Sequence, residues 1–424
     1  MSNLAHMQID PPPLPQEDDA APAPVMKPVP RITIHAFCEN PQTGSIIQRA
    51  GEDRRLARAH LTVHMGGMRA AAEFYQQSAT PNLILVETMA GGNELFGHLA
   101  ALAEVCDAGT KVVVLGHLND VSVYREMIRQ GVNEYLVTPL SPIQIIEAIS
   151  RLYVDPDAPP IGRSIAFMGA KGGTGSSTIA HNVGWCISTR MNEDVIITDL
   201  DLAFGTAGLD FNHDPAQGIA DALMAPERLD DVLLDRLLVK CSDHLSLFAA
   251  PAVLDRDLDM DTESYESVLE IVRETVPCVI VDLPHIWSPW TKKLLMSADE
   301  IVITATPDLA SLRNAKNIID LAKQTRSNDG MPHLVINQVG VPKRPEIPVK
   351  DFAEAIGIEP TLVLPFNPGL FGAAANNGQM IEELDAKSKA TEGMRYLAKQ
   401  LCGREPTPMK AIKKSFLQRL ARKG

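Results

Sequence analysis

Short apolar runs alternate with amphipathic stretches along most of the chain, and this alternation predicts its fold. The runs are rich in Val, Ile and Leu, which is typical of strands buried on both faces of a parallel sheet. The stretches between them are long enough for crossover helices. We therefore expect an α/β protein with two doubly wound parallel sheets. The expected strands are 32–37, 81–87, 111–116 and 134–137 in a first set, and 164–170, 194–201, 277–284, 300–307, 333–339 and 361–366 in a second.

Composition divides the chain at its ends and in its middle. The first thirty residues are rich in proline and poor in large apolar side chains, so they cannot bury enough surface to offset ordering. A second proline-containing stretch without periodicity separates the two sets of strands. The expected division is a disordered leader (1–30), a first domain (31–153), a linker (154–162), a second domain (163–403), and a short linker with a terminal basic helix (404–424).

Charge and cysteine content narrow the class of protein. The net charge of −14 argues against general binding of nucleic acid, and the basic residues gather at the C-terminal end. The six cysteines are scattered without CxxC spacing, which favours reduced thiols over a metal site. No uninterrupted apolar run reaches the length of a membrane span. We expect a soluble, cytoplasmic protein.

The stretch AKGGTGSST, residues 170–178, is the strongest chemical motif in the chain. It lies between an expected strand and a helix expected to begin near Ser176. Small residues let backbone amides converge on phosphate oxygens, and the helix N-terminus adds partial positive charge. We therefore predict a phosphate-binding loop, although the usual lysine is replaced by Ser176. The residues expected to contact phosphate are Lys171, Gly172, Gly173, Thr174, Gly175, Ser176, Ser177 and Thr178.

Aspartates end two other expected strands of the second set, the set that also contains the strand before this loop. Asp199 and Asp201 end one expected strand, where a spacing of two residues would point both side chains the same way, and Asp282 ends another. Carboxylates at the ends of parallel strands converge where such folds bind ligands. Mg²⁺ prefers oxygen ligands, so Ser177 Oγ is expected on the metal as well.

The loop resembles that of the deviant phosphate-loop ATPases of the ParA/MinD superfamily, which reads xKGGxGK[ST]. The resemblance implies ATP and Mg²⁺ as cofactors and a homodimer that forms on ATP binding. Lys171 stands at the signature lysine, which in this superfamily reaches the partner's phosphates across a nucleotide sandwich. Ser176 stands at the ordinary loop lysine, so the lysine in cis is missing while the lysine in trans remains.

The same resemblance assigns roles to residues outside the loop. Asp201 would position the attacking water, Asp199 would contribute near the metal, and Asp282 would hold the Mg²⁺ shell. Asn337 matches the adenine-contacting asparagine, and Pro365 would line the base pocket. With Lys171, the two aspartates Asp199 and Asp201 complete the expected catalytic set. Whether ATP is hydrolysed stays open, because the loss of one ammonium group from the loop predicts slow turnover at most.

The first domain resembles response-regulator receiver domains in the order of its segments and in the stretch 131–141. The acceptor aspartate of receivers is matched by Glu87, the Ser or Thr after the fourth strand by Gly116, and the Lys-Pro pair by Thr138 and Pro139. Only Glu39 remains of the acidic metal-binding pair. We therefore expect a degenerate receiver that is not phosphorylated and serves as a docking or dimerisation surface.

The C-terminal stretch KAIKKSFLQRLARKG has the pattern of a basic amphipathic helix. Its apolar residues are expected on one face, with Lys and Arg on the flanks. This suits a helix at an anionic membrane surface, similar to the C-terminal targeting helix of MinD, or a helix docked on an acidic protein surface. The two alternatives stay open. The apolar face would comprise Ile412, Phe416, Leu417 and Leu420.

A degenerate receiver followed by an AKGGTGSST-type ATPase domain resembles the CpaE/TadZ proteins, the Tad (Flp) pilus assembly ATPases. This resemblance covers roughly residues 31–403. It implies an ATP-dependent positioning factor that works with the Tad secretion ATPase and other pilus assembly proteins, at the inner membrane or a cell pole. A non-hydrolysing scaffold and a ParA/MinD-type partition or division-site positioning ATPase are the alternatives.

Overall fold

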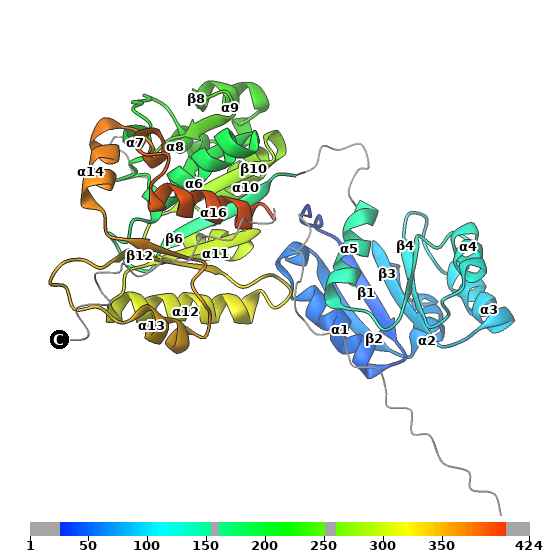
Figure 1. Ribbon diagram of the computed structural model, residues 1–424. Coiled ribbons are helices and arrows are strands. Elements are labelled where there is room, and N and C mark those ends of the chain that lie inside the picture. The colour runs from blue at the N-terminus through cyan, green and yellow to red at the C-terminus, as the bar shows by residue number, and fades with distance from the viewer. Residues whose placement is uncertain (1–25, 154–160, 251–259, 404–424) are drawn as a thin grey trace, which may run out of the picture.

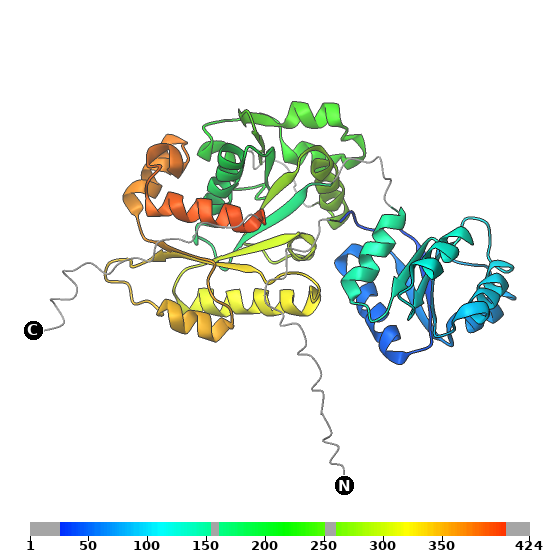
Figure 2. The same cartoon turned by 45° about the vertical axis from the view of Figure 1, so that its right-hand side comes forward.

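The protein folds around two sheets that form separate bodies lying side by side (Figures 1 and 2). The computed structural model describes residues 26–153, 161–250 and 260–403. Both sheets are built from parallel strands with crossover helices between them, apart from one antiparallel edge strand. The expected α/β fold class with two doubly wound sheets is therefore confirmed. The exact domain boundaries stay a prediction.

The N-terminal body contains a five-stranded parallel sheet in the order β2-β1-β3-β4-β5. This is the flavodoxin-like strand order, whose switch point lies between β1 and β3. The sequence pattern missed β2 because an edge strand is only half covered: none of its six residues is buried. The strands are β1 (Thr33–Cys38), β2 (His60–Met65), β3 (Leu83–Thr88), β4 (Lys111–Gly116) and β5 (Glu134–Val137).

Helices cover both faces of this sheet and bury its alternate side chains in two cores. One face packs against α1 (Pro41–Gly51), the 3₁₀ helix η1 (Arg54–Leu56) and α5 (Pro142–Tyr153). The other face packs against α2 (Gly67–Tyr75), α3 (Gly92–Ala103) and α4 (Val121–Arg129). Burial on both faces explains why β3 contains only apolar or fully enclosed residues.

The C-terminal body contains an eight-stranded sheet in the order β13-β12-β11-β6-β10-β7-β9-β8. The sequence pattern missed β8 and β9, which are four residues long and lie at the edge, where β8 runs antiparallel to β9. The strands are β6 (Arg163–Gly169), β7 (Val195–Asp199), β8 (Val239–Ser242), β9 (Leu245–Phe248), β10 (Cys278–Leu283), β11 (Glu300–Ala305), β12 (His333–Val339) and β13 (Leu362–Pro365).

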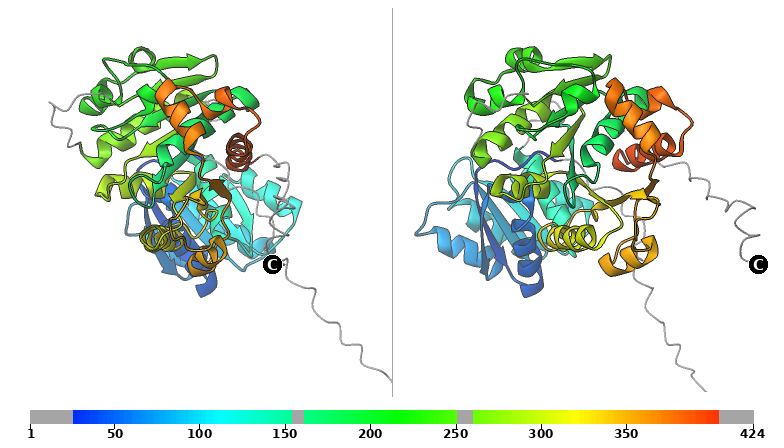
Figure 3. Two further views of the ribbon diagram at one scale, coloured as in Figure 1. Left: turned by 60° about the vertical axis from the view of Figure 1, so that its left-hand side comes forward. Right: turned by 90° about the vertical axis from the view of Figure 1, so that its left-hand side faces the viewer.

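Two groups of helices enclose this larger sheet, and in Figure 3 the orange and red helices gather on one side of it. The first group contains these orange and red helices together with α6 and α7. Its members are α6 (Ser176–Met191), α7 (Ala207–Asp210), α14 (Pro368–Asn377), α15 (Ile381–Leu384) and α16 (Lys389–Leu401). The second group is α8 (Ile219–Met224), η2 (Pro226–Arg228), α9 (Asp231–Leu237), α10 (Thr262–Thr275), α11 (Pro289–Ser297), α12 (Leu309–Thr325) and α13 (Val349–Ile356).

A network of buried ion pairs joins the two bodies. Arg54 of η1 donates to Asp329 Oδ2 at 2.9 Å and to Asp299 Oδ1 at 3.0 Å, and Arg55 also pairs with Asp329. The side chains of Asp329 and Arg55 are only 2% and 1% exposed. Burial alone would raise the pKa of Asp329, but the hydrogen bond and charge of Arg54 outweigh it and lower that pKa. The junction is thus held by oppositely charged side chains that are buried and paired with one another.

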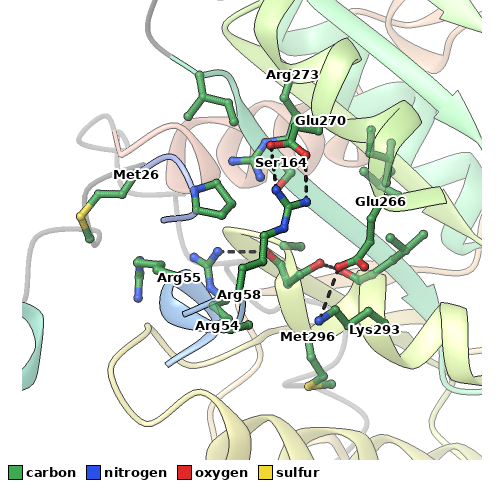
Figure 4. Close-up of a pocket in the computed structure, with 18 of the residues that line it drawn as sticks. Met26, Arg54, Arg55, Arg58, Ser164, Glu266, Glu270, Arg273, Lys293 and Met296 are labelled. Carbon is green, nitrogen blue, oxygen red and sulfur yellow. Dashed lines mark hydrogen bonds and ion pairs between the residues drawn. The ribbon is translucent and has the colours of Figure 1, made fainter. Parts of the chain in front are cut away.

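The rim of this junction is more open. A pocket of about 300 Å³ lies between the two bodies. Arg58 and Glu270, which contact each other, line it together with Arg273 and Ser164 (Figure 4). Arg58 donates to both carboxylate oxygens of Glu270, at 3.2 and 2.9 Å, but both side chains are more than one-third exposed. Water and salt screen such a pair, so it contributes little to stability.

The expected leader (1–30) lies mostly outside the described residues, and the expected basic helix lies outside them completely. The apolar face assigned to Ile412, Phe416, Leu417 and Leu420 therefore stays a prediction. In the described part of the chain, no helix has both the length and the apolar character needed to cross a membrane.

Replacing Arg54 with alanine should destabilise the protein much more than the same change at Arg58. Arg54→Ala leaves the buried carboxylates of Asp299 and Asp329 short of a partner, and such losses cost about 3 kcal/mol. Arg58→Ala removes an exposed pair and should cost less than about 1 kcal/mol. Urea unfolding followed by circular dichroism measures both, and equal losses would contradict the importance of the buried network.

Candidate functional site

The phosphate loop connects β6 to α6 at the carboxyl edge of the larger sheet. Helix α6 begins at Ser176, as expected from the sequence. Gly173 and Gly175 have φ values of 77° and 84°, and a Cβ at Gly175 would lie 2.7 Å from Asn337 Nδ2. Glycine at position 175 is therefore required by both backbone conformation and space.

Side chains behind the loop hold its carbonyl groups. Asn337 Nδ2 donates to the carbonyl of Thr174 at 2.8 Å, and Gln338 Nε2 donates to that of Gly173 at 3.0 Å. Both donors come from β12, so this strand fixes the shape of the loop. The first amides of a helix have no intrahelical acceptor, which leaves the start of α6 suited to an anion.

Asn337 therefore has a structural contact that its sequence motif did not indicate. The amide is 5% exposed and braces the loop. Its assignment to adenine contact stays a prediction. Pro365 is the last residue of β13 and is exposed, so it is available to a ligand at that end of the sheet.

Ser176, in place of the usual lysine, lies mostly buried at the first position of α6. Its Oγ is enclosed and has no hydrogen-bond partner within the described residues. Ser177 and Thr178 follow in the first turn and are half-buried. The loop thus presents hydroxyl groups and amides, but no ammonium group from position 176.

Lys171 is paired with a carboxylate of the same chain. Its Nζ lies 2.8 Å from Asp308 Oδ2, and both side chains are about one-third exposed. Asp308 also caps α12 by accepting a hydrogen bond from Ser311 N at 3.0 Å. Burial alone would raise the pKa of Asp308, but the hydrogen bonds from Lys171 and Thr306 lower it to about 2. Lys171 is therefore held beside the loop by an ionised partner.

Strand β7 ends at Asp199, earlier than expected, so Asp201 lies in the following loop. The strand alternation that was expected to orient both carboxylates alike does not extend to Asp201, and that inference was wrong. The chain instead turns so that Asp199 accepts hydrogen bonds from Asp201 N and Ala207 N, each at 3.1 Å. Burial and the nearby charge of Asp282 raise the pKa of Asp199 to about 7. Burial also raises the pKa of Asp201.

Asp282 ends next to Asp199, because β10 and β7 pair in register at these two residues. Asp282 is 3% exposed, and its Oδ2 lies 3.3 Å from His181 Nε2. The other ring nitrogen of His181 lies 2.7 Å from Asp210 Oδ2. Burial alone would lower the pKa of His181, but its two carboxylate neighbours raise it to about 10.

Sequence reasoning missed His181 and Asp210. His181 belongs to α6 and is fully buried, so its only signal is a polar residue at an apolar position of a helix. Nothing in the sequence pairs it with carboxylates 29 and 101 residues away. Near the end of β10, His285 Nδ1 lies 2.9 Å from the Gly169 carbonyl oxygen, and Trp290 stacks on Tyr265.

The side chains at this edge fit a bound phosphate with Mg²⁺. Asp282 Oδ1 and Ser176 Oγ are buried polar atoms that lack partners within the described residues. In the same part of the chain, no three His, Cys, Asp or Glu residues form a metal site by themselves. Mg²⁺ is usually held by one or two carboxylates, waters and substrate phosphates, which agrees with such a sparse set.

Large apolar side chains are exposed around the loop. They lie on the segments that follow β11 and β10, the two strands on either side of β6, and β7, the next strand beyond β10. Apolar groups gathered on a rim in this way mark an interaction surface. This loop rim comprises Phe204 (74% exposed), Ile286 (57%), Trp287 (53%) and Leu309 (73%).

In the N-terminal body, Glu87 lies at the end of β3 and is completely enclosed. Its carboxylate accepts hydrogen bonds from Glu39 N and Asn40 N at 2.8 Å and from Thr43 Oγ1 at 2.6 Å. Glu39 in turn accepts one from Met89 N. Both acidic groups therefore accept hydrogen bonds from neighbouring groups of the same chain, and the absence of receiver chemistry stays a prediction.

Comparison with known proteins agrees with this fold. A family model described as an AAA domain matches residues 162–334. A ParA family ATPase from Chlorobium tepidum TLS is 25% identical over 56% of this chain and 98% of its own, with a TM-score of 0.51. MinD from Pyrococcus horikoshii OT3, solved with Mg-ADP, is 17% identical over 57% of this chain and 96% of its own, with a TM-score of 0.50, and shows the fold alone.

A pilus assembly protein is much closer in sequence. CpaE from Caulobacter crescentus CB15 is 51% identical over 30% of this chain and 98% of its own. Its TM-score is 0.30, and the comparison rests on sequence identity. With the ParA-type fold of the larger body, this identity shows that the chain belongs to the CpaE/TadZ-type pilus assembly proteins of the ParA/MinD superfamily.

Proposed function

We propose that this protein binds Mg-ATP at the phosphate loop, dimerises through that face, and positions pilus assembly. The observation that carries the proposal is the meeting of a braced phosphate loop, the enclosed carboxylate of Asp282 and the signature Lys171 at one sheet edge. Known relatives support it: the MinD structure contains Mg-ADP, and the Caulobacter relative is a pilus assembly protein.

Each residue has a defined task in this proposal. The amides at the start of α6 and the hydroxyls of Ser176 and Ser177 would bind phosphate oxygens. Asp282 and Ser177 would hold Mg²⁺, which supplies positive charge to the phosphates. Thr174 is a buried residue of the loop, and its carbonyl accepts the hydrogen bond from Asn337 that holds the loop in shape.

The missing loop lysine makes a second copy of the chain important. Without an ammonium group at position 176, each loop lacks one positive charge against the nucleotide. Lys171 would leave Asp308 and supply that charge to the partner's nucleotide. Its present partner is about one-third exposed, so breaking the pair costs little. Tight nucleotide binding would then depend on dimer formation.

The loop rim supports this dimer. Phe204, Ile286, Trp287 and Leu309 would lose their exposure when a second copy covers the nucleotide. Burying apolar surface contributes about 25 cal/mol per Å², so these four side chains can stabilise a contact that the charges orient. The nucleotide would thus complete an interface that is already apolar.

Hydrolysis in this proposal is slow. Asp201 lies in the loop after β7, where it would orient water, while Asp199 maintains the fold of that loop. The phosphate loop has Ser176 where a lysine would stabilise the transition state in cis. A non-hydrolysing scaffold is the second candidate, and the observation that favours it is Ser176 together with the closed acidic pocket of Glu87.

The proposed cellular role follows the relatives. We propose that the dimer works with the secretion ATPase and other proteins of pilus assembly, at the inner membrane or a cell pole. The N-terminal body would serve as a docking surface, because its acidic pocket is occupied by its own backbone. The basic C-terminal residues would add a contact with membrane or an acidic protein.

Equilibrium titration of the full chain with Mg-ATP tests the proposal directly. The wild type should bind, and Lys171→Ala should weaken binding roughly tenfold or more, because it removes a charge-assisted contact to phosphate. Lys350→Ala is the matched control, since that lysine is 84% exposed on α13. No binding by the wild type at millimolar ATP would refute the nucleotide site.

Restoring the missing lysine should strengthen the site. Ser176→Lys places an ammonium group where other members of the superfamily have one, so ATP affinity should rise roughly tenfold. The gain should be largest under dilute conditions, where a second copy seldom supplies Lys171. Titration at two protein concentrations measures this, and equal affinity for variant and wild type at both would count against a phosphate contact at position 176.

A charge on the loop rim should prevent dimerisation. Trp287→Asp puts an unpaired carboxylate into the expected interface, so ATP should no longer convert monomer to dimer in analytical ultracentrifugation. Met331→Asp is the control, because Met331 is 47% exposed but follows α12 at the opposite end of that helix. A normal ATP-dependent dimer of Trp287→Asp would show that another surface is used.

A further inference from the structure

The buried His181 of α6 has no part in the motifs or in the function proposed above. It lies in the helix that begins at the phosphate loop and is 0% exposed. A buried polar side chain is costly unless it has partners, and here both ring nitrogens meet a carboxylate. Nδ1 lies 2.7 Å from Asp210 Oδ2, and Nε2 lies 3.3 Å from Asp282 Oδ2.

These two carboxylates come from different parts of the site. Asp282 is the penultimate residue of β10, whereas Asp210 is the last residue of α7, beyond the loop that contains Asp201. The ring of His181 therefore joins two segments that approach the phosphate loop from neighbouring strands. Helix α7 is held at both of its ends, since Asp199 accepts a hydrogen bond from Ala207 N and His181 contacts Asp210.

The two carboxylate oxygens of Asp282 have different surroundings. Oδ2 faces His181, while Oδ1 is buried without a partner in the described part of the chain. The Nε2–Oδ2 contact is an ion-pair contact and not a hydrogen bond, since Nε2 makes no hydrogen bond within the described residues. The ring thus restrains one oxygen and leaves the other available.

We propose that His181 is a positioning residue for Asp282, which it holds for the Mg²⁺ shell and couples to α7. This proposal rests on the function proposed above, because it concerns the same Mg-ATP site. Residues that orient a metal-holding group typically change metal affinity by roughly 10- to 100-fold when they are removed. A histidine that only filled the core would have no such effect on metal dependence.

The test uses the full chain and compares ATP affinity with Mg²⁺ and with EDTA. The ratio of these two affinities is the metal gain. His181→Leu should reduce the metal gain roughly tenfold, while ATP affinity in EDTA changes less than about twofold. His181→Gln keeps one donor and should retain part of the gain. His244→Gln is the control, because that exposed histidine also lies 2.7 Å from an aspartate, Asp194, near the start of β7.

Asp210→Asn tests the coupling without touching Asp282. This variant should also lower the metal gain, and it carries the test if His181→Leu does not fold. Amide hydrogen exchange of residues 205–212, measured without nucleotide, should be faster in both variants than in the wild type. This second readout does not depend on a loaded site.

The outcomes separate the two proposals. If the wild type binds Mg-ATP but folded His181 and Asp210 variants keep its metal gain and its exchange rates, the role of His181 is overturned and the nucleotide site stands. If the wild type binds no Mg-ATP, the proposed function is overturned together with this role. Reduced metal gain with faster exchange supports His181 as a positioning residue.

Discussion

The burial of charge at the carboxyl edge of the larger sheet is the constraint on which the site depends. Asp199 and Asp282 lie side by side on neighbouring strands and are almost fully enclosed, so their charges repel each other in a medium that screens weakly. The structure compensates with backbone amides around Asp199 and with His181 beside Asp282. The loop after β7 folds around Asp199 for this reason. The backbone conformation at this edge is therefore determined largely by the need to stabilise the buried carboxylates.

The phosphate loop lies at the same edge of the sheet as Asp199 and Asp282, and it presents backbone amides where they present carboxylates. The carbonyls of Thr174 and Gly173 accept hydrogen bonds from Asn337 and Gln338, and the ammonium group of Lys171 is paired with Asp308. These contacts from β12 hold the backbone of the loop in shape from behind.

Sequence patterns predicted the buried parts of the fold well and the half-buried parts poorly. Strands enclosed on both faces, such as β3 and β10, are continuous apolar runs and were recognised. The edge strand β2 is only half covered, and the edge strand β8 and its neighbour β9 are four residues long, so they lack that signal. In the site, the loop and Asp282 follow from local spacing. His181 and Asp210 do not, because their partnership exists only after α6 and α7 have packed together.

The junction between the two bodies has a consequence for how they can move. Asp299 directly precedes β11 and Asp329 follows α12, and both pair with Arg54 of the N-terminal body. The chain between these anchors runs out to Asp308, the residue that holds Lys171, and returns. Strand β11 and helix α12 thus form one segment that contacts the N-terminal body at both of its ends and contacts the phosphate loop at the turn between them. In the proposed function, a partner protein bound to the N-terminal body and a nucleotide that separates Lys171 from Asp308 would therefore both act on this one segment.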